Sequence, residues 1–322
     1  MVNPLSEQRD FSGQRLIFVG GVPRSGTTLL QNMLDCHPEI LGGPEFLYVP
    51  DIIQLRDRIR SAIDNRYIHH FCCREDLDRL VCDFIRRLLL PLADRNGCRL
   101  LSEKTPPNVL VFPQLLELFP DARLIHVIRD PRAVIASMLQ VGRRSRKVGW
   151  SLHPYAYSVA AGIEYTRRCF DAGFAAAGAA SQRVLTVSYE RLVSDPEAET
   201  RRVCRFLELE WSDRMLSPGQ FSHLGEEAIT NEVFYDRESY ERDPEIGQID
   251  KWKSQLTAVE QLRIASAFAG YEHLADYGYR FAVVPAPIRH RALAAMVDRL
   301  MGTTSRPAAI LQRLVRKLRC RW

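Results

Sequence analysis

The feature that most constrains this fold is a glycine-rich turn between an apolar run and a helical pattern near the amino terminus. Residues 16–19 are Leu-Ile-Phe-Val, a β-type run that ends in Gly20 and Gly21. Over residues 27–36, apolar side chains recur at helical spacing. A short strand, a tight turn and a helix in this order predict one unit of a parallel α/β sheet.

The same alternation returns twice further along the chain. Residues 123–128 form an apolar run before a helix-like stretch, and residues 184–187 form another before 197–207. Residues 52–92 are helical in pattern and predict an inserted helical layer. The fold class that follows is α/β: a P-loop-like, mainly parallel central sheet flanked by helices in a single catalytic domain.

The domain boundary is predicted near residue 284. At 322 residues, 46% of them hydrophobic, the chain is long enough for one well-buried α/β domain, which we expect over residues 1–284. Within it, residues 219–247 lack a clear period and predict a long loop over a binding site, whereas 258–268 is helical in pattern.

Residues 285–322 form a basic tail. They hold nine basic residues and one acid, so the tail carries about +8 of charge and the rest about −3, within a formal net charge of +5. Apolar residues recur in it at helical spacing beside these charges, as in a basic amphipathic helix. Two interpretations stay open: peripheral contact with an anionic membrane surface, or packing on the catalytic domain or on a second subunit of a homo-oligomer.

Composition also narrows the setting. No stretch reaches the roughly 20 apolar residues of a membrane span, and Glu7, Arg9 and Asp10 precede any apolar run, so we expect a cytoplasmic protein. Outside the tail the chain is not basic enough to indicate a nucleic-acid partner. The spacings of its 8 cysteines form no metal-ligand pattern, and no metal is expected.

The turn itself has the spacing of a phosphate-binding loop. Gly21 to Thr28 match a Walker A motif, except that Thr27 stands where that motif requires lysine. Backbone N–H groups before a helix bind phosphate, and a donor with one phosphosulfate arm carries less charge than a nucleoside triphosphate and can be held without metal. The alternative is a tight turn without a ligand.

Residues 23–28, Pro-Arg-Ser-Gly-Thr-Thr, resemble the 5'-phosphosulfate loop of the sulfotransferases that depend on 3'-phosphoadenosine-5'-phosphosulfate (PAPS). Residues 20–38 are similar to the tyrosylprotein sulfotransferase branch, and weaker similarity extends to about Tyr279. The resemblance implies an enzyme that transfers a sulfuryl group from PAPS to an acceptor hydroxyl and releases PAP. The loop residues that it assigns to the donor are Arg24, Ser25, Gly26, Thr27 and Thr28.

A second segment agrees with the first. Residues 127–132, followed by Ser137, resemble the segment in which an arginine and a serine hold the 3'-phosphate that distinguishes PAPS from ATP. Arg129 offers a planar fork to phosphate oxygens, and Ser137 adds a hydroxyl. Taken alone, Arg129 with its neighbouring acid is equally an ordinary surface ion pair. Tyr189 and Lys251 resemble further nucleotide contacts, although a packing role explains each as well.

Two residues are candidates for the chemistry. Glu45 lies at the distance from the loop arginine at which tyrosylprotein sulfotransferases have their catalytic glutamate, which implies a general base. Lys104 matches the lysine that meets the bridging oxygen of the donor, a task that Arg24 would share. The alternatives are an exposed loop carboxylate and a solvated lysine, and His37 would be the next candidate base.

The acceptor side departs from the resemblance. Gly42 and Ser102 stand where the animal enzymes have two disulfide-bonded cysteines, which fits a reducing compartment. Leu47 replaces an acceptor-binding arginine, and Val141 replaces another arginine for which Arg143 or Arg144 could substitute. The sequence therefore leaves the acceptor open among tyrosyl or phenolic, sugar and lipid head-group hydroxyls.

Two rival functions remain. A P-loop kinase or NTPase would need a loop lysine and an acid that binds magnesium after an apolar strand, and neither is evident. A catalytically silent nucleotide-binding, membrane-associated scaffold would not need five reactive residues together, namely Arg24, Glu45, Lys104, Arg129 and Ser137.

Overall fold

The computed structural model describes residues 12–225, 231, 233–234, 240 and 243–281. The chain divides into two compact units, 1–256 and 257–322. The first unit contains the central sheet and all of the residues that the sequence analysis assigned to donor and base.

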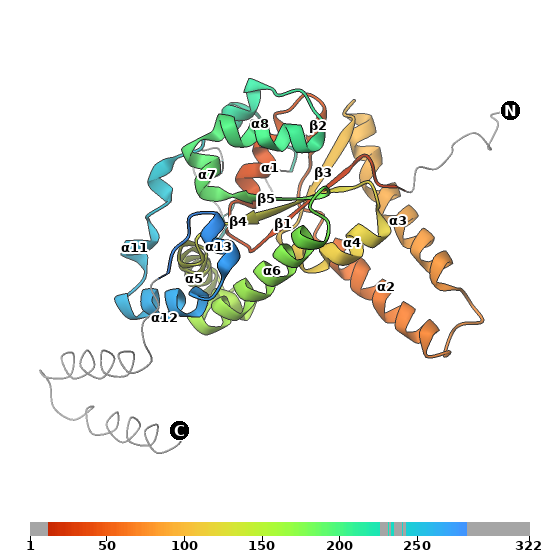
Figure 1. Ribbon diagram of the computed structural model, residues 1–322, viewed down its shortest axis with the longest axis horizontal. Coiled ribbons are helices and arrows are strands. Elements are labelled where there is room, and N and C mark those ends of the chain that lie inside the picture. Colours follow the sequence, from red (N-terminus) through yellow and green to blue (C-terminus); the bar gives the residue numbers. More distant parts are fainter. Residues whose placement is uncertain (1–11, 226–230, 232, 235–239, 241–242, 282–322) are drawn as a thin grey trace, which may run out of the picture. The chain divides into compact units, whose positions relative to one another are not determined.

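A five-stranded sheet forms the centre of the first unit (Figure 1). Its strand order is β2-β3-β1-β4-β5, and each neighbouring pair is parallel. The strands are β1 (Leu16–Gly21), β2 (Ile40–Gly42), β3 (Leu100–Lys104), β4 (Arg123–Ile128) and β5 (Val184–Ser188). The predicted parallel α/β sheet is confirmed, with β2 and β3 added to the three strands that the sequence indicated.

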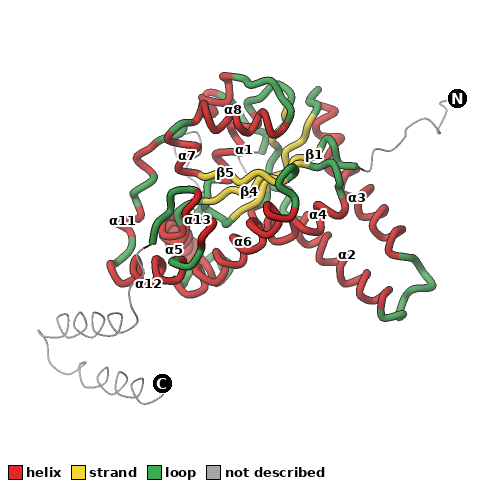
Figure 2. Tube along the Cα trace, viewed as in Figure 1, coloured by secondary structure: helices red, strands yellow, loops and turns green. Residues whose placement is uncertain are grey.

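Helices cover both faces of this sheet, as Figure 2 shows. Apolar side chains of β1, β4 and β5 pack with α1, α7 and α8 in one core, and α4 and α6 lie on the other face (Figure 2). The helices of the first unit are α1 (Thr27–Asp35), α2 (Val49–Asp64), α3 (Arg74–Arg95), α4 (Phe112–Leu118), α5 (Pro131–Lys147), α6 (Val159–Ala179), α7 (Tyr189–Ser194), α8 (Pro196–Leu207) and α11 (Trp252–Gln255). Short 3-10 helices are η1 (Pro106–Val111), η2 (Pro154–Ala156), η3 (Asp213–Leu216), η4 (Pro218–Gln220) and η5 (Ile246–Gln248).

The face covered by α6 contains a buried histidine. The ring of His126, on β4, packs edge-on to Phe174 at 5.2 Å and to Phe170 at 6.4 Å between ring centroids. A Cβ atom on Gly173 would lie 2.3 Å from this ring, so α6 approaches β4 closely only because that position is glycine. Burial lowers the pKa of His126 to about 3, so the ring is neutral at physiological pH.

The predicted inserted layer is a pair of helices, α2 and α3, rather than one run. Pro91 lies inside α3, which continues to Arg95. The buried guanidinium of Arg56 on α2 donates to Asp78 on α3 and to Glu117 on α4, so these ion pairs tie the layer to the sheet domain. Among the described residues, none of the helices combines the length and hydropathy that crossing a bilayer requires.

The second unit contains α12 (Ala258–Phe268), with the bounds that the sequence predicted, and α13 (Glu272–Asp276). Thr257 begins α12 with a capping box, because its hydroxyl accepts from the N–H of Glu260 while the carboxylate of Glu260 accepts from the N–H of Thr257. The basic tail, residues 285–322, lies outside the described residues. The domain division at residue 284, the membrane contact and the homo-oligomer therefore stay predictions.

Candidate active site

The loop between β1 and α1 is held in a tight turn. The N–H of Ser25 donates to the carbonyl of Val22 at 3.0 Å, and Gly26 has φ +99° at the start of α1. A Cβ atom on Gly26 would lie 2.4 Å from Cδ2 of Tyr189, so only glycine fits there. Arg24 has φ +75°, a left-handed conformation that costs a non-glycine residue about 1 kcal/mol. Such strain is typical of ligand-binding turns.

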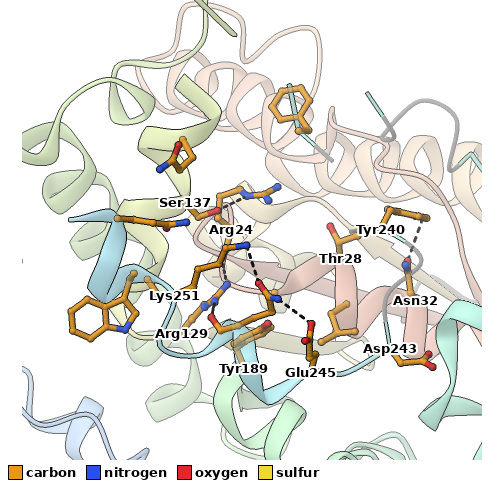
Figure 3. A pocket seen from close by; sticks show the side chains of 18 of the residues that line it. Arg24, Thr28, Asn32, Arg129, Ser137, Tyr189, Tyr240, Asp243, Glu245 and Lys251 are labelled. Atoms are coloured by element: carbon orange, nitrogen blue, oxygen red, sulfur yellow. Dashed lines mark hydrogen bonds between the residues drawn. The ribbon is translucent and has the colours of Figure 1, made fainter. Parts of the chain in front are cut away.

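A cavity of about 410 Å³ lies beside this loop (Figure 3). Its size is in the range of small-molecule and cofactor sites. It is bordered by the loop, by α5 and by the segment before α11. Figure 3 shows that the side chains lining the cavity come from these separate elements and point inward. Seven of the residues predicted to bind the donor line it, namely Arg24, Gly26, Thr28, Arg129, Ser137, Tyr189 and Lys251.

Arg129 and Ser137 meet the loop across this cavity. Nε of Arg24 donates to the hydroxyl of Ser137 at 3.1 Å. The guanidinium of Arg129 stacks on the ring of Tyr189 at 3.9 Å, and its Nη2 donates to the carbonyl of Gln248 at 2.9 Å. The structure thus brings together the two segments that sequence similarity paired. The surface ion-pair interpretation of Arg129 does not hold, because Asp130 instead binds Arg132 and caps α5.

Two polar atoms in these segments are buried without a partner among the described residues. They are Oγ of Ser25 and Nε of Arg129. Such atoms are costly unless they are satisfied by a ligand or by water. Ser25 and Thr27 are buried and do not belong to the lining of the cavity, so their predicted donor contacts stay predictions.

The segment around α11 borders the cavity on another side. Nζ of Lys251 lies 3.5 Å from Oε1 of Gln248, and Trp252 stacks on the guanidinium of Arg132 at 4.2 Å. Phe234, Tyr240, Asp243 and Glu245 also line the cavity, which agrees with the prediction that residues 219–247 cover a binding site.

Of the two arginines proposed to substitute at Val141, the structure favours one. Val141 is buried, whereas Arg144 lines the cavity and donates to the carbonyl of Val233 at 2.8 Å. Arg143 is exposed and is not part of the cavity lining.

The candidate base lies on the other side of Thr28. Lys104 is the last residue of β3, its side chain is 1% exposed, and its Nζ forms an ion pair with the carboxylate of Glu45. The same Nζ donates to the hydroxyl of Thr28 at 3.2 Å. The solvated-lysine interpretation is therefore wrong, and the side chain of Glu45, at 26% exposed, is more enclosed than a free loop carboxylate.

Neither Glu45 nor Lys104 lines the 410 Å³ cavity. Thr28 joins the two groups, because it both lines the cavity and accepts from Lys104. We call the cavity the donor side and the Lys104–Glu45 pair the base side, after their predicted roles; the two are adjacent regions with one shared side chain. The other candidate base, His37, is buried and its Nε2 bonds the carbonyl of Glu210 at 2.7 Å, which leaves it away from both regions.

The loop that carries Glu45 is anchored to α1. The N–H of Gly42 donates to Oδ1 of Asp35 at 2.6 Å, and Nε2 of Gln31 donates to the carbonyl of Gly43 at 3.2 Å. Gly42 and Ser102 are Cα partners in the β2–β3 pairing, so the two cysteine positions of the resemblance are neighbours here as well.

Sequence reasoning missed several residues of this site. Glu103, Thr105 and Asn108 form a buried polar cluster beneath the Glu45 loop. The one available signal was the run of four polar residues, 102–105, beside an apolar stretch. Among the described residues, no group of three side chains could hold a metal ion.

Comparison with known proteins gives one family. The model of the sulfotransferase family matches residues 16–213. The chain is 31% identical over 242 residues to "Protein-tyrosine sulfotransferase A" of Caenorhabditis elegans, covering 73% of this chain and 60% of that protein. It is 28% identical over 258 residues to "Protein-tyrosine sulfotransferase" of Drosophila melanogaster, covering 77% of this chain and 50% of that protein.

The chain thus spans between half and three fifths of the length of these two relatives. Among solved structures, the sulfotransferase domain from the curacin biosynthetic pathway superposes with a TM-score of 0.55 at 21% identity, over 78% of this chain and 95% of that one. At this identity the likeness concerns the fold alone.

Proposed function

The chain belongs to the sulfotransferase family, and we propose that it transfers a sulfuryl group from PAPS to a tyrosyl hydroxyl. The observation that carries the proposal is the gathering of seven predicted residues around one cavity, five of them from the two phosphate-type segments, with Thr28 linking the cavity to the Lys104–Glu45 pair. The tyrosyl acceptor rests on the names of the relatives, which share the matched region with this chain.

The residues present suit a 3'-phosphorylated nucleotide. Nε of Arg129 and Oγ of Ser25 are buried and have no partner in the described part of the chain, so they offer donors that a bound anion would satisfy. Arg129 and Ser137 would hold the 3'-phosphate, while the backbone of the loop and Arg24 would hold the phosphosulfate side. Tyr189 supports Arg129 from below through ring stacking at 3.9 Å. Because Thr27 replaces the lysine of a Walker A loop, we propose binding without a divalent metal.

PAPS supplies an electrophilic sulfur whose bond to a phosphate oxygen breaks as the acceptor oxygen bonds to it. Glu45 takes the proton of the acceptor hydroxyl. Lys104 and Arg24 place positive charge where the departing phosphate oxygen gains negative charge. In the present structure Lys104 neutralises Glu45 through their ion pair. When donor is bound, the lysine is therefore positioned to leave the carboxylate of Glu45 and to pair with the phosphate of the donor.

A transfer assay tests this function. The full chain is incubated with sulfur-35 PAPS and a tyrosine-containing peptide, beside the same peptide with phenylalanine in place of tyrosine. We expect label on the tyrosine peptide alone. Label on neither peptide would remove the tyrosyl acceptor, and the same assay with sugar and lipid acceptors then separates a different acceptor from a silent scaffold.

A binding measurement addresses the kinase or NTPase alternative. In calorimetry with PAP and with ATP, each with and without EDTA, we expect PAP to bind more tightly than ATP and EDTA to have no effect. Equal affinities, or PAP binding that is lost on chelation, would contradict the assignment of the donor.

A further inference from the structure

The carboxylate of Glu103 is buried beneath the loop that carries Glu45, and the reaction proposed above gives it no role. Glu103 is 2% exposed. It accepts from the hydroxyl of Thr105 at 2.6 Å, from Nδ2 of Asn108, and from the backbone N–H of Phe46 at 3.3 Å. Burial raises the pKa of Glu103, while these three donors oppose that effect. A carboxylate in such a place is expensive for stability, which calls for a reason.

Thr105 extends this cluster to the next residue of the loop. Its hydroxyl donates to Glu103 and accepts from the backbone N–H of Leu47 at 3.1 Å. Leu47 has φ +69°, a left-handed conformation that a leucine adopts only when its surroundings impose it. Glu103 and Thr105 therefore hold the two residues that directly follow Glu45.

Strand β3 and the residue that follows it thus act on the Glu45 loop from two sides. Successive residues of a strand point to opposite faces, so Lys104 points away from Glu103, and Thr105 comes directly after the end of the strand. Lys104 binds the side chain of Glu45, and the Glu103–Thr105 pair binds the backbone just beyond it. Asn108 completes the arrangement, since its Nδ2 also donates to the carbonyl of Val19 on β1 at 3.3 Å.

We propose that Glu103 and Thr105 are positioning residues for sulfuryl transfer, which fix the loop so that the carboxylate of Glu45 meets the acceptor hydroxyl. They touch neither donor nor acceptor and act through Glu45. This inference rests on the proposed function and on Glu45 as its base. It differs from a purely structural role in one measurable respect: loss of the cluster lowers turnover while nucleotide affinity is kept, because the donor cavity does not include these residues.

The test compares three threonine variants of the full chain. Thr105→Val keeps the shape of the side chain and removes both of its hydrogen bonds, whereas Thr105→Ser keeps the hydroxyl. Thr200→Val is the matched control, because Thr200 is also fully buried on α8 and its hydroxyl donates to the carbonyl of Pro196 at 2.7 Å and accepts from Nε1 of Trp211 at 3.0 Å. Each variant is measured for kcat on the peptide that the wild-type chain sulfates, for PAP affinity and for Tm.

We expect kcat of Thr105→Val to fall about 10- to 100-fold, the range that a misplaced catalytic group produces. PAP affinity should stay within about twofold, and Thr105→Ser should recover to within about threefold of the wild-type kcat, since the hydroxyl is restored. Thr200→Val should lower Tm and leave kcat unchanged. Equal kcat in Thr105→Val and Thr200→Val overturns the proposal, and so does a loss of PAP affinity as large as the loss of kcat.

Two further measurements keep the outcome clear. If Thr105→Val does not fold, Glu103→Gln takes its place, because the amide keeps the shape and one acceptor oxygen but removes the charge, and the same split between kcat and PAP affinity is required. If the wild-type chain transfers the sulfuryl group and Glu45→Gln abolishes this transfer, the proposed function is established, whatever the result for Thr105→Val. A wild-type chain that transfers no sulfuryl group overturns the function and the positioning role together.

Discussion

The donor side and the base side of this site are built in opposite ways. The donor side is an open cavity of about 410 Å³, and Ser25 and Arg129 beside it have buried polar atoms without partners in the described chain. On the base side, Lys104 is 1% exposed and is already paired with Glu45, and Glu103 receives three hydrogen bonds. One region is prepared for a ligand, and the other is satisfied internally.

This difference separates binding from chemistry. The donor side is completed only when an anion binds, whereas the loop of Glu45 is already fixed through the hydrogen bonds of its backbone to Glu103 and Thr105. Variants on the donor side should therefore change affinity, and variants on the base side should change turnover.

Replacement of the base gives the largest effect. Glu45→Gln should lower turnover by roughly 10² to 10⁴, the usual contribution of a general base, and leave PAP affinity within a few-fold. Turnover with sulfur-35 PAPS and calorimetry with PAP measure the two quantities. A fully active Glu45→Gln chain would show that another residue accepts the proton, and the two regions would then not divide as described.

Replacement of a donor-side arginine should act on affinity first. Arg129→Ala should weaken PAP binding about 10- to 100-fold, since hydrogen bonds to charged groups contribute about 1.5–3 kcal/mol. Affinity for 5'-AMP, which lacks the 3'-phosphate, should change much less. If PAP and 5'-AMP lose equal affinity in calorimetry, Arg129 supports the cavity through its stacking on Tyr189 and does not select the 3'-phosphate.

The loop between β1 and α1, which carries Gly26 on the donor side, can be tested through the stability of the chain. Gly26→Ala introduces a side chain at φ +99° and at 2.4 Å from the ring of Tyr189. We expect the free energy of unfolding in urea to fall by about 1–3 kcal/mol, together with PAP affinity, because the loop must shift. Gly178→Ala is the control, since a Cβ atom there meets nothing within 4 Å. A neutral Gly26→Ala would mean that the turn relaxes freely and is not preformed.

The burial of His126 makes the stability of the fold depend on pH, and this effect must be separated from the pH dependence of activity. The pKa of His126 is about 3 in the folded chain and near 6.5 when unfolded, so between these values the unfolded state binds more protons and stability falls as pH falls. At pH 5 the loss is about 2 kcal/mol relative to pH 7. Urea unfolding at both pH values should show a larger loss in the wild-type chain than in His126→Leu. Equal losses would assign the acid sensitivity to other groups.

The sequence located the residues around the cavity better than the packing of Lys104 and Glu45, for a physical reason. The phosphate loop and the Arg129 segment are each local, because a strand, a turn and a helix follow one another within a few residues, and their pattern identifies them. The sheet and helix α12 were predicted in the same way. Contacts such as Arg24 with Ser137, 113 residues apart, follow from the parallel order of the strands.

The base side depends on strands that the patterns did not indicate. Strand β2 has three residues, too few for a period, and β3 contains Ser102, Glu103 and Lys104, whose polar side chains hide a buried strand. The burial of Lys104 and the role of Glu103 arise from packing between α1, β3 and the Glu45 loop. Such networks of distant partners have no local signal, which is why a solvated lysine stayed open as an alternative.

The strand order has a consequence for how such a protein can be altered. Because β1 lies between β3 and β4, the Glu45 loop hangs from one half of the sheet and the 3'-phosphate segment from the other. Residues 43–48 are fastened mainly by main-chain atoms, through Gln31, Glu103 and Thr105. A loop that keeps Glu45 and offers the same main-chain groups, but differs in its other side chains, could be grafted there without altering the segment after β4.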